Sequence, residues 1–252
     1  MNDTAIILTA FGTSTEARST YDFFEAQARE RFPRHDIHWA YTSRTLRAKM
    51  ARKGILWRSP EELLRELPER GYCRAVIQSL HIVPGKEFDK IAAAAAQAPL
   101  PAAVGQPLLS CSADCQPVLD ALATHIPDPA STITVLAGHG TPHHEATALY
   151  NEFSRQLRLR YPENVYLCMV EGEPSWAETL TRMKKTTLRR VRIVPFMFVA
   201  GDHILHDVLG DGNSWLAQLE GYEVDALRSG LGHNAAIADV FFQHMQAAFT
   251  LL

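Results

Sequence analysis

Three apolar runs in the second half of the chain recur at intervals of about thirty residues, and they constrain the fold more than any other feature. They cover residues 132–137, 165–170 and 191–200, and each is rich in Val, Ile and Leu. Runs of this kind are typical of strands buried on both faces of a parallel sheet. Because one strand and its following helix occupy about thirty residues, the spacing predicts successive βα units.

A polar residue follows the end of each run: His139, Glu171 and His203, each 32 residues after the last. The carboxyl ends of parallel strands meet at one edge of a sheet, where ligands bind in open α/β folds. With strand order 2-1-3-4, the three residues follow adjacent strands about 4.8 Å apart. Two imidazoles and a carboxylate suit a divalent metal ion. We therefore expect a metal site, with Asp202 as a hydrogen-bonding partner of His203.

The two halves of the chain repeat one order of elements. Strands at 5–10 and 132–137 are each followed by a glycine-containing turn, and a later strand in each half ends at Gly85 or Gly201. Four βα units per half predict an α/β fold of two domains, each a four-stranded parallel sheet flanked by helices, related by internal duplication. We place these domains at 1–126 and 127–252, and the last helix could pack on the first domain. The expected helices cover 17–32, 61–69, 87–97, 113–125, 144–160, 175–185, 214–219 and 235–249; further strands are expected at 36–41, 104–109 and 222–227.

The first half carries an insertion that the second half lacks. Aligning Phe11 with His139 gives an offset of 128, whereas aligning Gly85 with Gly201 gives 116, so twelve residues are extra. They coincide with residues 43–54, which predict a short helix with five positive charges and no acidic residue.

This basic helix could attract a polyanionic substrate through Arg44 and Arg47, helped by Lys49 or Arg52, or it could be a solvated basic face. Glu87 of the first half lies close to the position that His203 has in the second. We therefore expect Glu87 to act on the opposite side of a bound ligand.

Composition excludes several other classes of protein. The chain is 46% apolar and 21% charged with a formal charge of −3, so nucleic-acid binding is not expected. No apolar stretch is long enough to predict a membrane span and no basic leader is visible, so we expect a cytoplasmic protein without a membrane partner. The four cysteines are expected to be reduced thiols. No phosphate loop or dinucleotide motif is present, so no nucleotide cofactor is expected. A homo-oligomer is compatible with the sequence.

Six segments in this order resemble the ATP-independent cobalt chelatases of anaerobic corrin biosynthesis, which are relatives of ferrochelatase. The resemblance implies two flavodoxin-like domains with a cleft between them, where Co²⁺ is inserted into sirohydrochlorin, an acidic tetrapyrrole. It implies His139, Glu171 and His203 as metal ligands, with His139 or Glu171 also accepting the pyrrole protons. The segments are residues 11–14 (FGTS), 78–82 (QSLHI), 138–140 (GHG), 199–203 (VAGDH), 211–215 (DGNSW) and 229–232 (SGLG).

On this interpretation, substrate contacts are expected from the following residues: Phe11, Ser43, Arg44, Arg47 and Glu87. Lys86 and His206 depart from the family pattern, so Fe²⁺ or Ni²⁺ stays an alternative to Co²⁺. A non-catalytic protein that binds metal or tetrapyrrole is a second alternative. A histidine phosphotransfer enzyme is a third, although Gly138 stands where that chemistry favours arginine.

Overall fold

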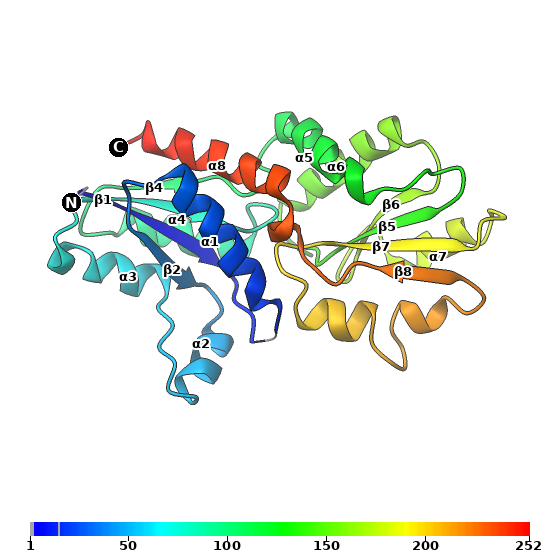
Figure 1. Ribbon diagram of the computed structural model, residues 1–252, viewed down its shortest axis with the longest axis horizontal. Coiled ribbons are helices and arrows are strands. Elements are labelled where there is room, and N and C mark those ends of the chain that lie inside the picture. Colours follow the sequence, from blue (N-terminus) through cyan, green and yellow to red (C-terminus); the bar gives the residue numbers. More distant parts are fainter. Residues whose placement is uncertain (1–2, 15) are drawn as a thin grey trace. The chain divides into compact units, whose positions relative to one another are not determined.

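The computed structural model describes residues 3–14 and 16–252, and its chain divides into two compact units (Figure 1). The first unit contains Met1–Ser110 and Ala235–Leu252, and the second contains Cys111–Asn234. The chain therefore passes from one unit to the other twice. None of the helices in the described residues is both long and apolar enough to cross a membrane.

The sheet of the first unit has the four parallel strands that were predicted, in the order β2-β1-β3-β4. Every residue of β1 is buried, in keeping with a sequence that is apolar apart from Thr4 and Thr9. The last strand ends at Gly105, earlier than the predicted range of 104–109. Beyond it, the Gln106 carbonyl accepts from the side-chain amide of Gln78 at 2.8 Å instead of from the backbone of β3. The strands are β1 (Thr4–Ala10), β2 (Ile37–Tyr41), β3 (Arg74–Ser79) and β4 (Ala102–Gly105).

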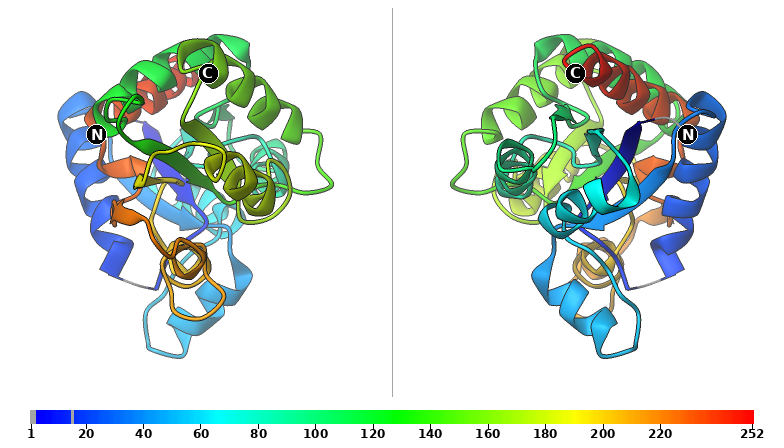
Figure 2. Two further views of the ribbon diagram at one scale, coloured as in Figure 1. Left: turned by 90° about the vertical axis from the view of Figure 1, so that its right-hand side faces the viewer. Right: turned by 90° about the vertical axis from the view of Figure 1, so that its left-hand side faces the viewer.

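Helices of the first unit cover its sheet. On one side α8 packs against β3, β4 and α1, and Figure 2 shows α8, in red, beside α1, in blue. The Phe24 ring contributes to this packing, with its centroid 5.9 Å from that of Phe241 and 5.0 Å from that of Phe242. The predicted basic helix forms as α2. The helices are α1 (Ser19–Arg31), α2 (Arg44–Ala51), α3 (Pro60–Glu66), α4 (Lys86–Ala96) and α8 (Ala235–Phe249).

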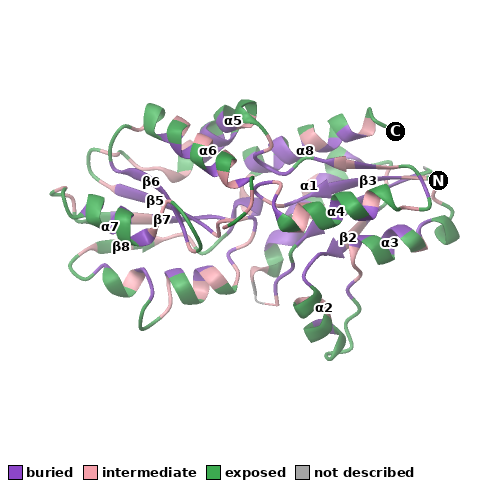
Figure 3. Ribbon diagram, turned by 180° about the vertical axis from the view of Figure 1, so that it is seen from behind, coloured by how far each residue is buried: buried purple, intermediate pink, exposed green. Residues whose placement is uncertain are grey.

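The second unit repeats the same sheet topology, with four parallel strands in the order β6-β5-β7-β8. The predicted α/β fold of two four-stranded parallel sheets is confirmed. Figure 3 shows the central strands buried and the outer faces of the helices exposed. The strands are β5 (Ile133–Gly138), β6 (Val165–Met169), β7 (Arg190–Phe196) and β8 (Glu223–Ala226).

Both faces of the second sheet carry an apolar core. Phe153 stacks on Phe196 on one face, with ring centroids 4.9 Å apart. On the other, the Trp176 and Trp215 rings are parallel within 2° at 4.8 Å. The helix predicted at 214–219 forms only a single 3₁₀ turn, Leu216–Gln218. The helices are α5 (Cys115–Leu122), α6 (Thr147–Arg160) and α7 (Trp176–Met183).

The limits of the units differ from the expected division at 126 and 127. α5 packs against α6 of the second unit, and Asp120 at its end forms an ion pair with Arg160. The Asn234 side chain donates to the Ala121 carbonyl at 2.9 Å and further ties α5 to the second unit. The helix that follows the first four strands thus belongs to the second unit, whereas the final helix, α8, belongs to the first.

Candidate metal-binding site

His139 lies on a tight turn directly after β5, and the residue that follows it must be glycine. A Cβ on Gly140 would lie 1.8 Å from the Glu171 carbonyl oxygen, and Gly140 has φ +90°. A Cβ on Gly138 would lie 2.7 Å from the Met169 sulfur. The segments after β5 and β6 therefore approach closely, and the Glu171 N–H donates to the His139 carbonyl at 2.9 Å.

His203 follows β7 by several residues, because β7 ends at Phe196 rather than at the predicted residue 200. Residues 197 and 198 instead accept hydrogen bonds from the N–H groups of Leu231 and Gly232, at 2.8 and 3.0 Å. His203 then precedes a short π-helical turn, Ile204–Val208. The connection returns the chain so that the imidazole lies beside His139.

The partner of His203 is Asp207 rather than the expected Asp202. The Asp207 Oδ2 atom lies 2.7 Å from His203 Nδ1, whereas Asp202 is exposed and makes no recorded contact with the ring. Spacing of four residues on a helical turn places Asp207 next to His203. That spacing is the sequence signal that could have identified it.

The two imidazoles meet through their Nε2 atoms, which lie 3.1 Å apart, with ring planes 89° from parallel. His139 Nδ1 lies 3.1 Å from the Gly140 carbonyl oxygen, and His203 Nδ1 lies against Asp207. A ring nitrogen facing such an oxygen carries the proton, so both Nε2 atoms are left with lone pairs. Two lone pairs that face each other repel unless a proton or a cation lies between them.

The separation of these nitrogens suits a shared metal ion. Two nitrogens bound at about 2.0–2.1 Å to one ion, with an angle of roughly 90–109° between them, are about 2.8–3.4 Å apart. The 3.1 Å between His139 and His203 lies within that range. The distance between the two nitrogens is therefore compatible with one divalent cation bound by both rings.

Glu171 does not join the two histidines through its side chain. The sequence argument assumed a buried carboxylate, but Glu171 is exposed, because the left-handed Gly172 (φ +98°) turns the chain outward after β6. Within residues 3–14 and 16–252, no three His, Cys, Asp or Glu side chains are close enough together to hold a metal ion. The structure thus brings together two of the three predicted ligands, and the third stays a prediction.

The family follows from sequence comparison: the profile of the cobalt chelatase (CbiK) family matches residues 4–250. The chain belongs to this cobalt chelatase family. A sirohydrochlorin cobaltochelatase, CbiKC, from Nitratidesulfovibrio vulgaris is 30% identical over 264 residues, covering 100% of this chain and 93% of the relative. The sirohydrochlorin cobaltochelatase of Salmonella typhimurium is 31% identical over 258 residues, covering 98% of this chain and 97% of the relative.

Solved structures of other chelatases share the fold. SirB from Bacillus subtilis with Fe³⁺ aligns with a TM-score of 0.65 at 14% identity, over 98% of this chain and 96% of that one. CbiX, described as the terminal enzyme of sirohaem biosynthesis in denitrifying bacteria, aligns with a TM-score of 0.57 at 18% identity, over 98% and 99%. At these identities the likeness supports the fold alone.

The residues predicted to contact the substrate all lie in the first unit of this chelatase, and three of them are at or in α2. Ser43 caps this helix by accepting from the Leu46 N–H at 3.3 Å. Arg47 forms an ion pair with Glu62 at 3.3 Å, whereas Arg44 is exposed and has no carboxylate partner among the described residues. Phe11, which directly follows β1, has a ring that is 47% exposed.

Glu87 lies in the first turn of α4, where its carboxylate pairs with Lys90 through one oxygen. The other oxygen, Oε2, is buried and has no hydrogen-bond partner in the described structure, and the same is true of His81 Nε2. The His81 Nδ1 atom does have a partner, the Ser79 hydroxyl at 2.9 Å. Burial lowers the pKa of His81 to about 4, while the Glu87 charge opposes that shift.

Two further histidines follow the His139 turn but do not join the pair. His143 is exposed with φ +61°, and His144 accepts from the Ala146 N–H at 3.1 Å, so both belong to the turn before α6. His206 and Lys86, the two departures from the family pattern, are both exposed.

Proposed function

We propose that this protein inserts Co²⁺ into sirohydrochlorin without a nucleotide cofactor. The observation that carries the proposal is the pair of Nε2 atoms, His139 and His203, that face each other at 3.1 Å with lone pairs available for a cation. Relatives of about 30% identity that match nearly the whole chain are named for this substrate and metal.

In this proposal Glu171 is the third group that holds the metal substrate. Its backbone N–H is bonded to the His139 carbonyl, so its Cα lies beside the histidine turn. Its side chain is exposed and forms no hydrogen bond or ion pair with the residues that the structure describes, so rotation about its side-chain bonds can bring the carboxylate toward the imidazoles. A mixed set of two imidazoles and a carboxylate suits first-row divalent ions.

Metal insertion also requires a proton acceptor, because two pyrrole nitrogens lose their protons as the ion enters. A group that has just released the metal has a free lone pair and lies beside the reacting nitrogen. We assign this role to His139 or Glu171. Asp207 would stabilise positive charge on His203 during transfer, because its carboxylate faces Nδ1 at 2.7 Å.

The acidic substrate would be held from the first unit. Arg44 offers an exposed guanidinium without a carboxylate partner among the described residues, and Lys49 lies on the same helix. Guanidinium groups suit carboxylates because they donate two parallel hydrogen bonds. Phe11 presents an exposed aromatic face for the flat macrocycle, and Ser43, Arg47 and Glu87 complete the proposed contact set.

The experiment is an absorbance assay of the purified protein with sirohydrochlorin and, in turn, Co²⁺, Fe²⁺ or Ni²⁺. We expect many turnovers with Co²⁺ in the absence of nucleotide. Binding of one equivalent without release of metallated product would instead indicate a carrier protein. Faster turnover with Fe²⁺ or Ni²⁺ would move the assignment to the corresponding chelatase.

Two variants connect the activity to the site. His139→Ala should reduce cobalt insertion by at least about a hundredfold, because it removes one of two preorganised ligands. His143→Asn is the matched control, since it removes a nearby exposed histidine while keeping a residue that tolerates φ +61°. Full activity in His139→Ala would overturn the proposal.

A further inference from the structure

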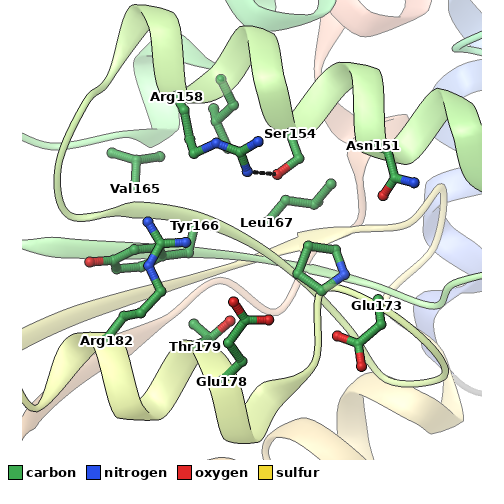
Figure 4. Close-up of a pocket in the computed structure, with 12 residues that line it drawn as sticks. Asn151, Ser154, Arg158, Val165, Tyr166, Leu167, Glu173, Glu178, Thr179 and Arg182 are labelled. Carbon is green, nitrogen blue, oxygen red and sulfur yellow. Dashed lines mark hydrogen bonds between the residues drawn. The ribbon is translucent and has the colours of Figure 1, made fainter.

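A groove of about 280 Å³ in the second unit lies between α6 and α7, and its two arginines are engaged by their own neighbours (Figure 4). Arg158 donates to the Ser154 hydroxyl at 2.8 Å. The Arg182 guanidinium lies 4.8 Å from the centroid of the Tyr166 ring. No side-chain nitrogen or oxygen among the residues that line this groove is both buried and without a hydrogen-bond partner. The end of β3 in the first unit differs in this respect.

The His81 ring, just after β3, has one nitrogen that is bonded and one that is not. The Ser79 hydroxyl lies 2.9 Å from Nδ1, and its oxygen also accepts from the His81 backbone N–H at 3.5 Å. The hydroxyl proton is therefore directed at Nδ1, which leaves the single proton of the neutral ring on Nε2. This Nε2–H group is shielded from solvent and has no acceptor among the described residues.

Glu87 carries the complementary atom six residues later, in the first turn of α4. Its Oε1 atom pairs with Lys90, whereas Oε2 is buried and has no donor among the described residues. Burial lowers the pKa of His81 to about 4 and the charge of Glu87 opposes this shift, so the carboxylate lies close enough to act on the ring. An unpaired donor and an unpaired acceptor are thus buried in the same neighbourhood.

We propose that His81 is a positioning residue, which fixes the Glu87 carboxylate through one bridging water molecule. The water would accept from Nε2–H and donate to Oε2, and so satisfy both buried atoms. Lys90 cannot fix the carboxylate alone, because its side chain is 56% exposed and exposed ion pairs are weak. Ser79, His81 and Glu87 thereby form one chain of hydrogen bonds that runs from β3 to α4.

The role of this chain rests on the proposed function, in which Glu87 contacts the tetrapyrrole. A carboxylate repels the acidic side chains of that substrate, but it can accept a hydrogen bond from an N–H group of the macrocycle. Such a bond forms only if the carboxylate is held in one orientation before the substrate binds. His81 supplies that orientation without touching the substrate.

The ring ¹⁵N resonances of His81 in the full-length protein test the hydrogen bonds without substrate. At pH 7 we expect a protonated Nε2 and an unprotonated Nδ1. Glu87→Gln should shift the Nε2 resonance, whereas Asp89→Asn, which neutralises an exposed carboxylate on the same helix, should leave it in place. A ring protonated at Nδ1, or an Nε2 resonance that Glu87→Gln does not shift, would overturn the proposal whatever the activity of the protein.

Steady-state kinetics with sirohydrochlorin and Co²⁺ test the positioning role. His81→Leu should lower kcat/KM about tenfold, because it removes a hydrogen bond directed to a charged group. His81→Gln should restore most of that loss, since its amide N–H can take the place of Nε2–H. In the Glu87→Gln background, His81→Leu should cause little further loss, because its effect passes through Glu87.

Equal losses from His81→Leu with and without Glu87 would overturn the positioning role while the proposed function stands. A wild-type protein that does not metallate sirohydrochlorin would contradict the proposed function, and the ¹⁵N measurement would still decide whether His81 holds Glu87. Amide NMR spectra that match the wild type show which variants fold. If His81→Leu does not fold, a loss in His81→Gln as large as that in Glu87→Gln would overturn the proposal.

Discussion

The Asp207 carboxylate lies 2.7 Å from Nδ1 of His203 and thereby determines which nitrogen of that ring can bind a metal ion. The proton stays on Nδ1, and the Nε2 lone pair is directed at His139. The Gly140 carbonyl does the same for His139 at 3.1 Å. The chemistry of the pair therefore depends on oxygens that do not themselves contact the metal.

Removing the Asp207 carboxylate should weaken metal binding without removing a ligand. We expect Asp207→Ala to lower Co²⁺ affinity by about 10–100-fold, as is usual for partners of metal-binding histidines. Isothermal titration calorimetry with Co²⁺ measures the change. Asp202→Ala is the control and should bind as the wild type does, since Asp202 is exposed and does not contact His203.

The close approach at Gly140 predicts a severe effect from one methyl group. Gly140→Ala places a Cβ at 1.8 Å from the Glu171 carbonyl and also adopts φ +90°, so the two segments beside His139 must separate. We expect a loss of at least about 2 kcal/mol in the free energy of unfolding, together with weaker Co²⁺ binding.

Gly221→Ala separates these two causes. Gly221 has φ +83° but open space around its Cβ, so this variant carries the backbone cost alone. Thermal unfolding should show a much smaller loss than for Gly140→Ala, with Co²⁺ binding unchanged. Equal losses in both variants would contradict the role given to the contact with Glu171.

His81 should make the stability of the protein depend on pH. Burial lowers its pKa to about 4 in the folded protein from the ordinary 6.5, so between these values the unfolded chain binds a proton that the folded chain does not. The free energy of unfolding should therefore fall as pH decreases through this window, by roughly 2 kcal/mol between pH 7 and 5. Urea unfolding at the two pH values measures this difference.

The variant His81→Asn should reduce this pH dependence, because it removes the titrating group. His206→Asn, which removes an exposed histidine, should keep the wild-type difference. An undiminished pH dependence in His81→Asn would show that other groups cause it.

Arg44 should affect substrate affinity more than turnover. Under the proposed function, Arg44→Gln removes a charge that attracts sirohydrochlorin, so we expect KM to rise several-fold while kcat changes little. The difference should shrink at high salt, because exposed charges are screened. Arg65→Gln is the control, since Arg65 pairs with Glu61 on the exposed face of α3. Steady-state kinetics at two ionic strengths measure both variants.

The buried strands could be predicted from their apolar sequence, and the meeting of His139 with His203 followed once the common strand order 2-1-3-4 was assumed. A mainly apolar run such as β5 predicts a central parallel strand, and equal spacing of strand ends predicts side chains at one edge. The N-terminal cap of α2 was equally predictable, because a serine followed by helix-forming residues is a local signal.

Features that depend on tertiary contacts could not be predicted in this way. The outward turn at Gly172 leaves Glu171 exposed, and a glycine in sequence does not reveal the sign of its φ. The assignment of α5 to the second unit depends on its contact with α6, which no local pattern records. Asp207 was missed because the strand and the π-helical turn have different limits from those expected.

The exchange of helices between the units has a consequence for biosynthesis. The first sheet is complete once β4 has been made, yet α8, which packs against β3 and β4, is translated after the entire second unit. On the ribosome the first unit would therefore hold its four strands with the part of one face over β3 and β4 uncovered while more than a hundred residues are added. The unit that begins synthesis first is the one that finishes folding last, so a chaperone that shields the face later covered by α8 would be most useful in that interval.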